Sequence, residues 1–215
     1  MFENRQDAGR KLAEKLMKFK DRQPLVLAIP RGGVEVGFEV ARKLDADFSI
    51  LVARKLPYPD NPEAGFGAVV EDGSFFIFPH AYHYYDKGTI NRIIAEQKQE
   101  VERRIRVLRD GETLPHIKGR VVILVDDGIA MGSTMRASIA ACRNLKAEEI
   151  IVAAPVTSNR VKSELQDMVS EVIILETPSN FRAVAQVYRH WYDVPDEEAV
   201  KIYRKWEKEY AGSLQ

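Results

Sequence analysis

Several features of secreted, membrane-bound and nucleic-acid-binding proteins are missing from this sequence. It contains a single cysteine, Cys142, which excludes an internal disulfide framework and is typical of the reducing cytosol. No apolar run approaches the length of a transmembrane helix, and residues 1–20 are too charged for a signal peptide. Lysine plus arginine and aspartate plus glutamate both number 32, so no basic surface for nucleic acid is indicated. The sequence predicts a cytoplasmic protein without membrane or nucleic-acid partners.

Linkers, internal repeats and low-complexity tracts are also missing, and the composition is that of one globular domain. The 215 residues are 45% hydrophobic and 30% charged, which suffices for one sizeable core. We therefore expect a single domain over residues 1–215, with a core at about 25–177 and a C-terminal part at about 177–210. Short apolar runs alternate with amphipathic stretches, which predicts an α/β fold with a mainly parallel sheet and helices on both faces. The expected strands are 25–29, 48–53, 121–125, 150–154 and 172–175, and the expected helices are 7–19, 34–44, 89–108, 158–168 and stretches beginning near 135 and 196.

The stretch 121–134, VVILVDDGIAMGST, carries the strongest functional pattern. Its apolar, β-branched start predicts a strand buried on both faces, and Asp126 and Asp127 follow at the end of that strand. A loop of small residues then leads to Ser133 and Thr134, which are expected to cap a helix. Free backbone N–H groups at a helix start bind anions. The stretch therefore predicts an acidic pair beside a phosphate site.

Two common phosphate-binding motifs do not fit this stretch. A Walker A loop requires a lysine before its serine or threonine, and Gly132 stands there. A dinucleotide fingerprint requires three closely spaced glycines, and only Gly128 and Gly132 are present. The simplest alternative is an ordinary strand–turn–helix in which both aspartates only shape the turn.

A second loop repeats this plan nearer the N-terminus. The expected strand at 25–29 is followed by Pro30 and then by Arg31, Gly32 and Gly33. An arginine offers bidentate hydrogen bonds to a phosphate, and glycines let the backbone approach an anion closely. In parallel sheets ligands bind at the carboxyl ends of the strands, so we expect both loops at one edge. An ordinary turn with a surface arginine is the alternative.

The stretch 121–134 resembles the signature of the type I phosphoribosyltransferases: a hydrophobic strand, two acidic residues, and a small-residue loop ending in Gly-x-Thr. IPRGG at 29–33 is similar to the pyrophosphate loop of that family, and chains of the bacterial and archaeal group called predicted phosphoribosyltransferases pair both motifs. The resemblance implies the type I phosphoribosyltransferase fold with a flexible loop and a small hood. It also implies 5-phosphoribosyl 1-diphosphate as donor, Mg²⁺ as cofactor, a nitrogenous acceptor such as a nucleobase, and release of pyrophosphate.

The same resemblance implies roles for single residues. Asp126 and Asp127 would face the ribose hydroxyls and the positive charge that develops at the anomeric carbon, and would meet Mg²⁺ through those hydroxyls or water. Arg31, Gly32 and Gly33 would hold the leaving pyrophosphate, in a loop that often contains a non-proline cis peptide in this family. The 5′-phosphate would lie on the loop formed by Gly128, Ile129, Ala130, Met131, Gly132, Ser133 and Thr134.

Two positions depart from the pattern of the resembled family. Met131 stands where the family often has threonine, so one hydroxyl to the phosphate is missing while the backbone N–H groups remain. Ala130 stands where many 6-oxopurine transferases carry aspartate. This change makes hypoxanthine and guanine less favoured acceptors, although one small residue does not decide a substrate.

Two further segments are expected to cover the site. Residues 56–67 are rich in proline and glycine, which predicts an irregular, mobile segment, and the resemblance makes it the loop that closes over the reacting centre. Lys55, with Arg54, would bring positive charge to pyrophosphate, although a solvated surface loop explains the pattern equally well. The hood would be 177–194, where Phe181 is the candidate for stacking on a flat acceptor and a core role is equally open.

Other conspicuous residues fit structural roles better. His80 and His83 lie in an aromatic region without further metal ligands. Cys142 shares a helical face with apolar residues, and Thr89 is expected to cap the long helix that follows it. Residues 68–78 predict a hairpin around a Glu-Asp-Gly-Ser turn.

An alternative function is a regulatory protein that binds the phosphoribosyl donor or a nucleotide without catalysis. Proteins of the resembled fold in that role usually add a DNA-binding domain or a basic RNA-binding face, and neither pattern occurs here. Release of pyrophosphate from the donor would separate the two functions. The sequence leaves open whether the chain forms a homodimer.

Overall fold

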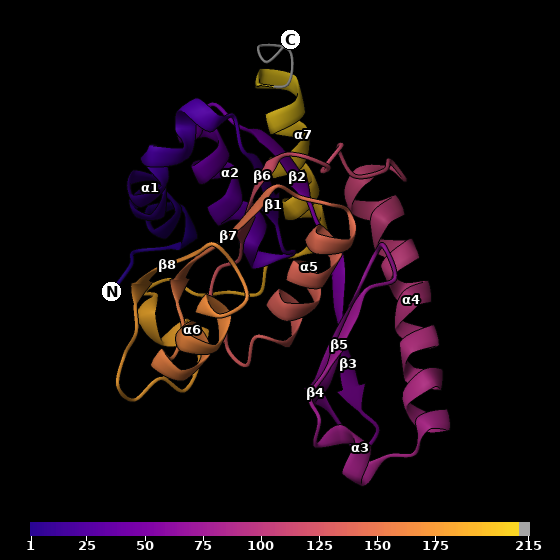
Figure 1. Cartoon of the computed structure of the whole chain (residues 1–215). Coiled ribbons are helices and arrows are strands. Elements are labelled where there is room, and N and C mark those ends of the chain that lie inside the picture. The colour runs from indigo at the N-terminus through magenta and orange to yellow at the C-terminus, as the bar shows by residue number, and fades with distance from the viewer. Residues whose placement is uncertain (211–215) are drawn as a thin grey trace.

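The computed structural model describes residues 1–210, and its centre is a parallel sheet (Figure 1). The strand order is β2–β1–β6–β7–β8, and each neighbouring pair is parallel. The predicted parallel sheet is therefore confirmed. Its strands are β1 (Leu25–Ala28), β2 (Asp47–Ile50), β6 (Val121–Val125), β7 (Glu149–Val156) and β8 (Glu171–Glu176).

Helices cover both faces of this sheet because alternate residues of a strand point to opposite sides. Ile123 and Val125 of β6 join one hydrophobic cluster, while Val122 and Leu124 join the cluster on the other face. Every residue of β6 is buried, which explains its uninterrupted apolar run. The first face carries α1 (Arg5–Leu16), α2 (Gly32–Leu44) and α7 (Asp196–Glu209), and the second carries α5 (Ser133–Asn144) and α6 (Asn159–Gln166).

A second, antiparallel sheet stands beside the long helix α4 (Lys87–Arg109) and projects from the main body (Figure 1). The prediction of an irregular backbone at 56–67 was wrong, because most of these residues belong to the paired strands of a hairpin. The register shifts on both sides of Pro57, and an edge strand or bulge tolerates a residue that has no N–H. The predicted hairpin around 68–78 is confirmed. The sheet consists of β3 (Ala53–Tyr58), β4 (Asn61–Val70) and β5 (Phe75–Ile77).

Three local predictions also need correction. The expected strand at 48–53 divides, because β2 ends at Ile50 in the parallel sheet and β3 begins at Ala53 in the other. Ser133 and Thr134 do not cap α5; Gly132 is the N-cap, with φ 79°, and no side chain caps this end. Thr89 does not cap α4 either, because the Asp86 carboxylate accepts the Thr89 N–H at 3.0 Å.

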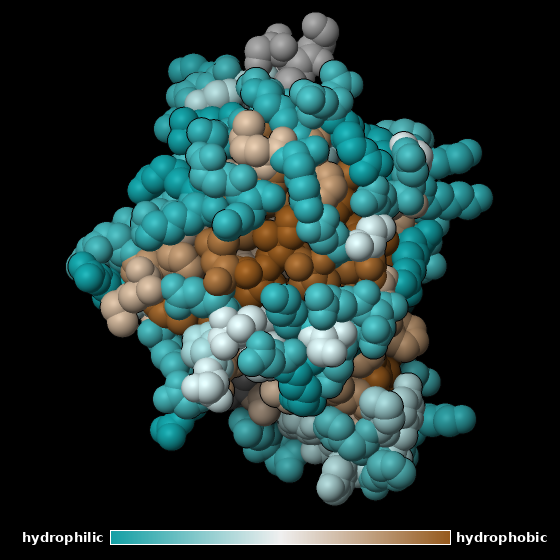
Figure 2. All heavy atoms as spheres, turned by 60° about the vertical axis from the view of Figure 1, so that its left-hand side comes forward, coloured by the Kyte–Doolittle hydropathy of each residue, from teal (hydrophilic) through white to brown (hydrophobic). Residues whose placement is uncertain are grey.

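The remaining elements are short. They are the 3₁₀ helices η1 (Met17–Arg22) and η2 (Val184–Val187) and the single turn α3 (Ala81–Tyr84). Apart from η2, the segment between β8 and α7 has no helix or strand. Figure 2 brings the side with α1 and β8 forward and shows a hydrophobic band between hydrophilic flanks. No helix within residues 1–210 has the length and apolarity needed to span a membrane.

Candidate active site

The loops after β1 and β6 lie side by side at the carboxyl edge of the sheet, because these two strands are hydrogen-bonded neighbours. A Cβ added at Gly32 would come within 1.8 Å of Asp127 Oδ2, and one added at Gly33 would lie 3.0 Å from Asp126 Cα. Glycine is therefore required at position 32 for this approach. The peptide between Pro30 and Arg31 is cis, as the resemblance implied.

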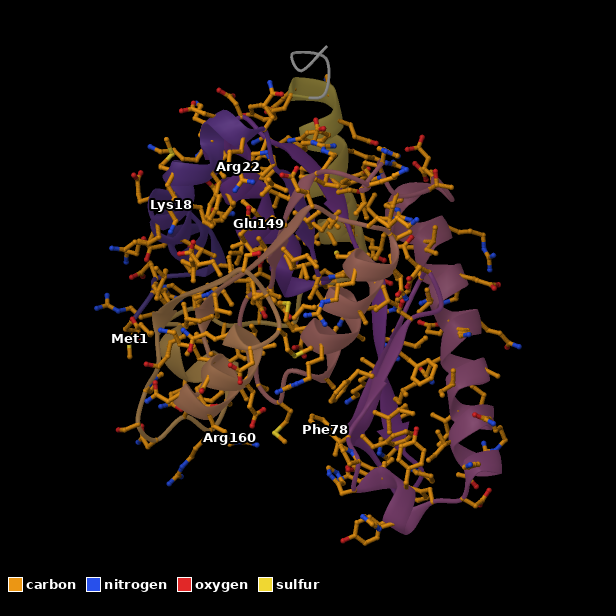
Figure 3. The ribbon with its side chains drawn as sticks, in the orientation of Figure 1. Met1, Lys18, Arg22, Phe78, Glu149 and Arg160 are labelled. Carbon is orange, nitrogen blue, oxygen red and sulfur yellow. The ribbon has the colours of Figure 1, made fainter. Side chains whose placement is uncertain are left out.

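A cavity of about 500 Å³ opens beside the loop after β6. The first helical bond of α5 runs from the Arg136 N–H to the Gly132 carbonyl, which leaves the preceding N–H groups without intrahelical partners. These N–H groups are the expected anion site. The hairpin forms the opposite wall, and Phe78, labelled in Figure 3, belongs to that wall. The lining residues are Lys55, Tyr58, Ala64, Gly65, Phe78, His80, Asp126, Gly128, Ile129, Ala130, Met131, Gly132, Ser133, Thr134 and Met135.

The two adjacent aspartates have different surroundings. Asp126 lines the cavity, and its Oδ1 accepts the backbone N–H of Asp127 at 2.8 Å. The Asp127 carboxylate does not line the cavity; its Oδ2 accepts the Arg5 Nε–H at 2.7 Å. Burial and then repulsion from Asp127 raise the pKa of Asp126. Burial also raises the pKa of Asp127, while Arg5 opposes that shift.

Of the three basic residues predicted near the pyrophosphate, one lines the cavity and two do not. Lys55 lines the cavity. Arg31 does not; its Nη1 lies 3.5 Å from Asp196 Oδ1 at the start of α7. Arg54 Nε donates to Gln97 Oε1 at 3.3 Å, and burial lowers the pKa of its guanidinium. The cavity therefore receives positive charge from the hairpin directly, whereas Arg31 lies at the edge of the site in an ion pair.

The segment 177–194, which was expected to form a hood, packs against the loop after β6. A Cβ added at Gly128 would lie 2.3 Å from Val184 Cγ1. Phe181 is half-buried and packs against a cluster that includes Phe2 and Tyr188. It is not among the residues that line the cavity. The hood therefore sits on the loop, and the Phe181 ring is packed behind it.

A profile of the phosphoribosyl transferase domain matches residues 2–190 of this chain. The chain belongs to the phosphoribosyl transferase family. The predicted type I phosphoribosyltransferase fold is thereby confirmed, with its parallel sheet flanked by helices.

Individual relatives agree with this family assignment. Two Mycobacterium tuberculosis proteins, MT0597 and Rv0571c, are 35% identical over 213 residues, and their names assign them provisionally to the phosphoribosyl transferases. The match covers 98% of this chain and 48% of each relative, so the chain spans about half their length. The structure of TT1426 from Thermus thermophilus is 36% identical and has a TM-score of 0.81, covering 96% of this chain and 99% of that chain.

The sequence did not single out Arg5, which reaches the acidic pair from α1. Arg5 is 3% exposed, and its Cζ lies 4.0 Å from the centroid of the Trp191 ring. One signal was available: Arg5 precedes Leu12 and Leu16 at helical spacing, on the buried face of an otherwise charged helix. A charge at the head of an apolar stripe indicates a buried partner.

The structural roles predicted for other residues are also visible. A hydrogen bond of 2.8 Å joins the Tyr58 hydroxyl and His80 Nε2, and the His80 ring stacks on Phe78. Cys142 is fully buried in α5, which confirms its place in the core, and burial raises the pKa of its thiol to about 12. The Tyr188 hydroxyl donates to the Asp127 carbonyl at 2.6 Å, so hood packing reaches the site.

Proposed function

We propose that this chain transfers the phosphoribosyl group of 5-phosphoribosyl 1-diphosphate to a nitrogen of a small heterocyclic acceptor, with release of pyrophosphate. Membership of the phosphoribosyl transferase family supports phosphoribosyl transfer in general. One observation carries the finer proposal: a single cavity is lined by Asp126, by the N-terminal turn of α5 and by Lys55. Asp126 would face the ribose, the start of α5 would bind the 5′-phosphate, and Lys55 would bind the diphosphate.

The residues around the cavity have separate tasks in this reaction. The backbone from Ala130 to Thr134 would bind the 5′-phosphate, because N–H groups at a helix start favour anions. Gly32, Gly33 and Lys55 would hold the diphosphate, with Arg31 joining them once it leaves Asp196. The bond between the anomeric carbon and the diphosphate oxygen breaks, and its electron pair leaves with pyrophosphate. Asp126 would stabilise the positive charge that develops at that carbon.

Mg²⁺ is proposed as the cofactor. Within residues 1–210 no three His, Cys, Asp or Glu side chains are grouped to hold a metal. Mg²⁺ does not require such a cluster, because it commonly keeps several waters and is bound through one or two carboxylates together with substrate phosphates. Bound Mg²⁺ would neutralise charge on the diphosphate leaving group. Asp126 would contact it through water or the ribose hydroxyls.

The acceptor is proposed to be a flat base such as a nucleobase, since stacking on aromatic rings contributes roughly 1–3 kcal/mol per base. Two rings are candidates for this contact. Phe181 belongs to the hood but packs against Phe2 and Tyr188, whereas Tyr58 lines the cavity from the hairpin. Phe181→Ala and Tyr58→Ala separate them: the ring that stacks should raise the acceptor KM about tenfold when lost, equivalent to ~1.4 kcal/mol.

The experiment that tests the proposal is a pyrophosphate-release assay. The chain is mixed with donor, Mg²⁺ and each member of a nucleobase panel, and pyrophosphate is measured over time. Release that depends on one base supports transfer. Donor binding without release for any base would instead favour the regulatory alternative.

A further inference from the structure

Arg5 is a buried cation that contacts one member of the acidic pair at the candidate active site. It lies in the first turn of α1, and its Nε donates to Asp127 Oδ2 at 2.7 Å. Its Nη1 lies 3.6 Å from Glu35 Oε1 on α2. A buried charge is costly unless it is paired. The fold therefore places this arginine against the Asp127 carboxylate, with the Glu35 carboxyl group as a more distant neighbour.

Aromatic side chains of the hood fix the guanidinium in place. Arg5 Cζ lies 4.0 Å from the centroid of the Trp191 ring and 5.3 Å from that of Tyr192. A planar guanidinium stacks on such rings and donates hydrogen bonds in a fixed geometry at the same time. One side chain thus joins α1, α2, the hood and the loop after β6.

The Arg5–Asp127 pair also lies directly against the proposed pyrophosphate loop. A Cβ at Gly32 would be 1.8 Å from Asp127 Oδ2 and 2.8 Å from Arg5 Nε. The pair therefore occupies the space behind this loop, while Asp126 lines the cavity in front. Asp127, which is paired with Arg5, therefore lies outside the cavity, and Asp126 is the acidic residue that a ligand in the cavity can reach.

We propose that Arg5 is a positioning residue of the active site. It holds Asp127 away from the cavity and compensates its charge, so that Asp126 is the acidic group that meets the substrate. The proposal rests on the proposed function, because its consequence is tight binding of a polyanionic donor. Without Arg5, the Asp127 carboxylate would lose both the hydrogen bond that holds it behind the loop and the cation that compensates it, so the negative charge it keeps would add to the repulsion of the diphosphate.

The test is a set of charge-compensating variants, with donor affinity measured by calorimetry in the presence of Mg²⁺. Arg5→Met should weaken donor binding about tenfold or more, within the range of coupling energies for contacting residues. Adding Asp127→Asn to Arg5→Met removes the uncompensated charge, so affinity should return to within about threefold of the wild-type value. The control is Arg10→Met, which changes an exposed arginine of the same helix and should leave donor affinity unchanged.

Each outcome of this test has a defined meaning. If the double variant binds donor no better than Arg5→Met, Arg5 serves structure only and the proposal is wrong. If Arg5→Met does not fold by circular dichroism, the double variant is measured in its place: donor affinity within about threefold of the wild-type value supports the proposal, and a loss of tenfold or more contradicts it. A wild-type chain that binds no donor refutes the proposed function and this role together, whereas failed compensation in a donor-binding chain refutes only the role of Arg5.

Discussion

At the scale of single residues, the neighbouring aspartates are not equivalent. Asp126 lines the cavity, whereas Asp127 is 13% exposed and forms an ion pair with Arg5. The sequence shows two identical side chains in succession, and the resemblance gave both the same ribose-facing role. Their difference arises from α1, which begins more than a hundred residues earlier in the chain.

This difference predicts separate effects of two isosteric changes. Asp126→Asn should lower kcat about a hundredfold or more, because it removes a carboxylate that stabilises developing charge, and should leave the melting temperature near the wild-type value. Asp127→Asn should lower the melting temperature as well, because it removes the nearer of the two acidic partners of the buried Arg5. Steady-state kinetics and thermal unfolding measure both effects. Wild-type kcat in Asp126→Asn would show that the cavity is not the reaction site.

Gly32 gives a second prediction at this scale. Gly32→Ala should weaken donor binding about tenfold or more, because the new methyl group overlaps Asp127 Oδ2 and must displace it. Gly119→Ala is the matched control: that glycine has φ 73° and open space around it, so alanine there costs roughly 1–2 kcal/mol of stability without changing donor affinity. Calorimetry and thermal unfolding distinguish the two. Equal donor affinity in both variants would show that the approach to Asp127 is unimportant.

At the scale of whole elements, sequence patterns predicted the parallel sheet better than the hairpin. The strands of the sheet are continuous apolar runs, because both faces are covered, and such runs are easy to recognise. β3 and β4 contain Pro57, Pro62 and several glycines, which locally indicate irregular structure. Their pairing depends on packing against α4 and α5, and no short window of sequence contains that information. The loops after β1 and β6 could be predicted because their glycines form recognisable local motifs. The contact between Arg5 and Asp127 could not, because it joins two distant parts of the chain.

The junction of α1, α2 and the hood contains a carboxyl group with an altered pKa. Burial raises the pKa of Glu35 above its ordinary value of 4.5, and Arg5 opposes this shift in part. The Tyr192 hydroxyl lies 3.2 Å from Glu35 Oε1 and 2.8 Å from Glu198 Oε1. One hydroxyl proton cannot serve two carboxylates, so a proton on Glu35 satisfies this arrangement.

Glu35 therefore predicts a pH-dependent stability. The folded state holds the Glu35 proton more tightly than the unfolded state, so this group stabilises the fold at low pH and loses that contribution as the pH rises above 4.5. In Glu35→Gln the group no longer titrates. The melting temperature of the variant, relative to the wild type, should rise between acidic and neutral pH. Thermal unfolding across this range measures it, and a constant difference would contradict the raised pKa.

At the scale of the whole molecule, the cavity lies between two separately built parts. Its floor belongs to the parallel sheet, through Asp126 and the start of α5, and its other wall belongs to the hairpin, through Lys55, Tyr58 and Gly65. The hairpin projects from the main body (Figure 1). A ligand held by both parts would connect them, so binding should be visible in the hairpin itself.

Donor binding should therefore slow hydrogen exchange in residues 56–67, the segment that was expected to close over the site. A diphosphate bound between Lys55 and the loop after β6 links the hairpin to the sheet, and linkage to a bound state suppresses local opening. A nucleoside 5′-monophosphate reaches the loop but carries no diphosphate, so it should protect the start of α5 and leave the hairpin largely unprotected. Amides of β6, buried with and without ligand, provide the internal reference. Mass spectrometry of exchange in the free, monophosphate-bound and donor-bound chain measures all three regions. Equal exchange of 56–67 in every state would show that the hairpin is a fixed wall rather than a cover for the diphosphate.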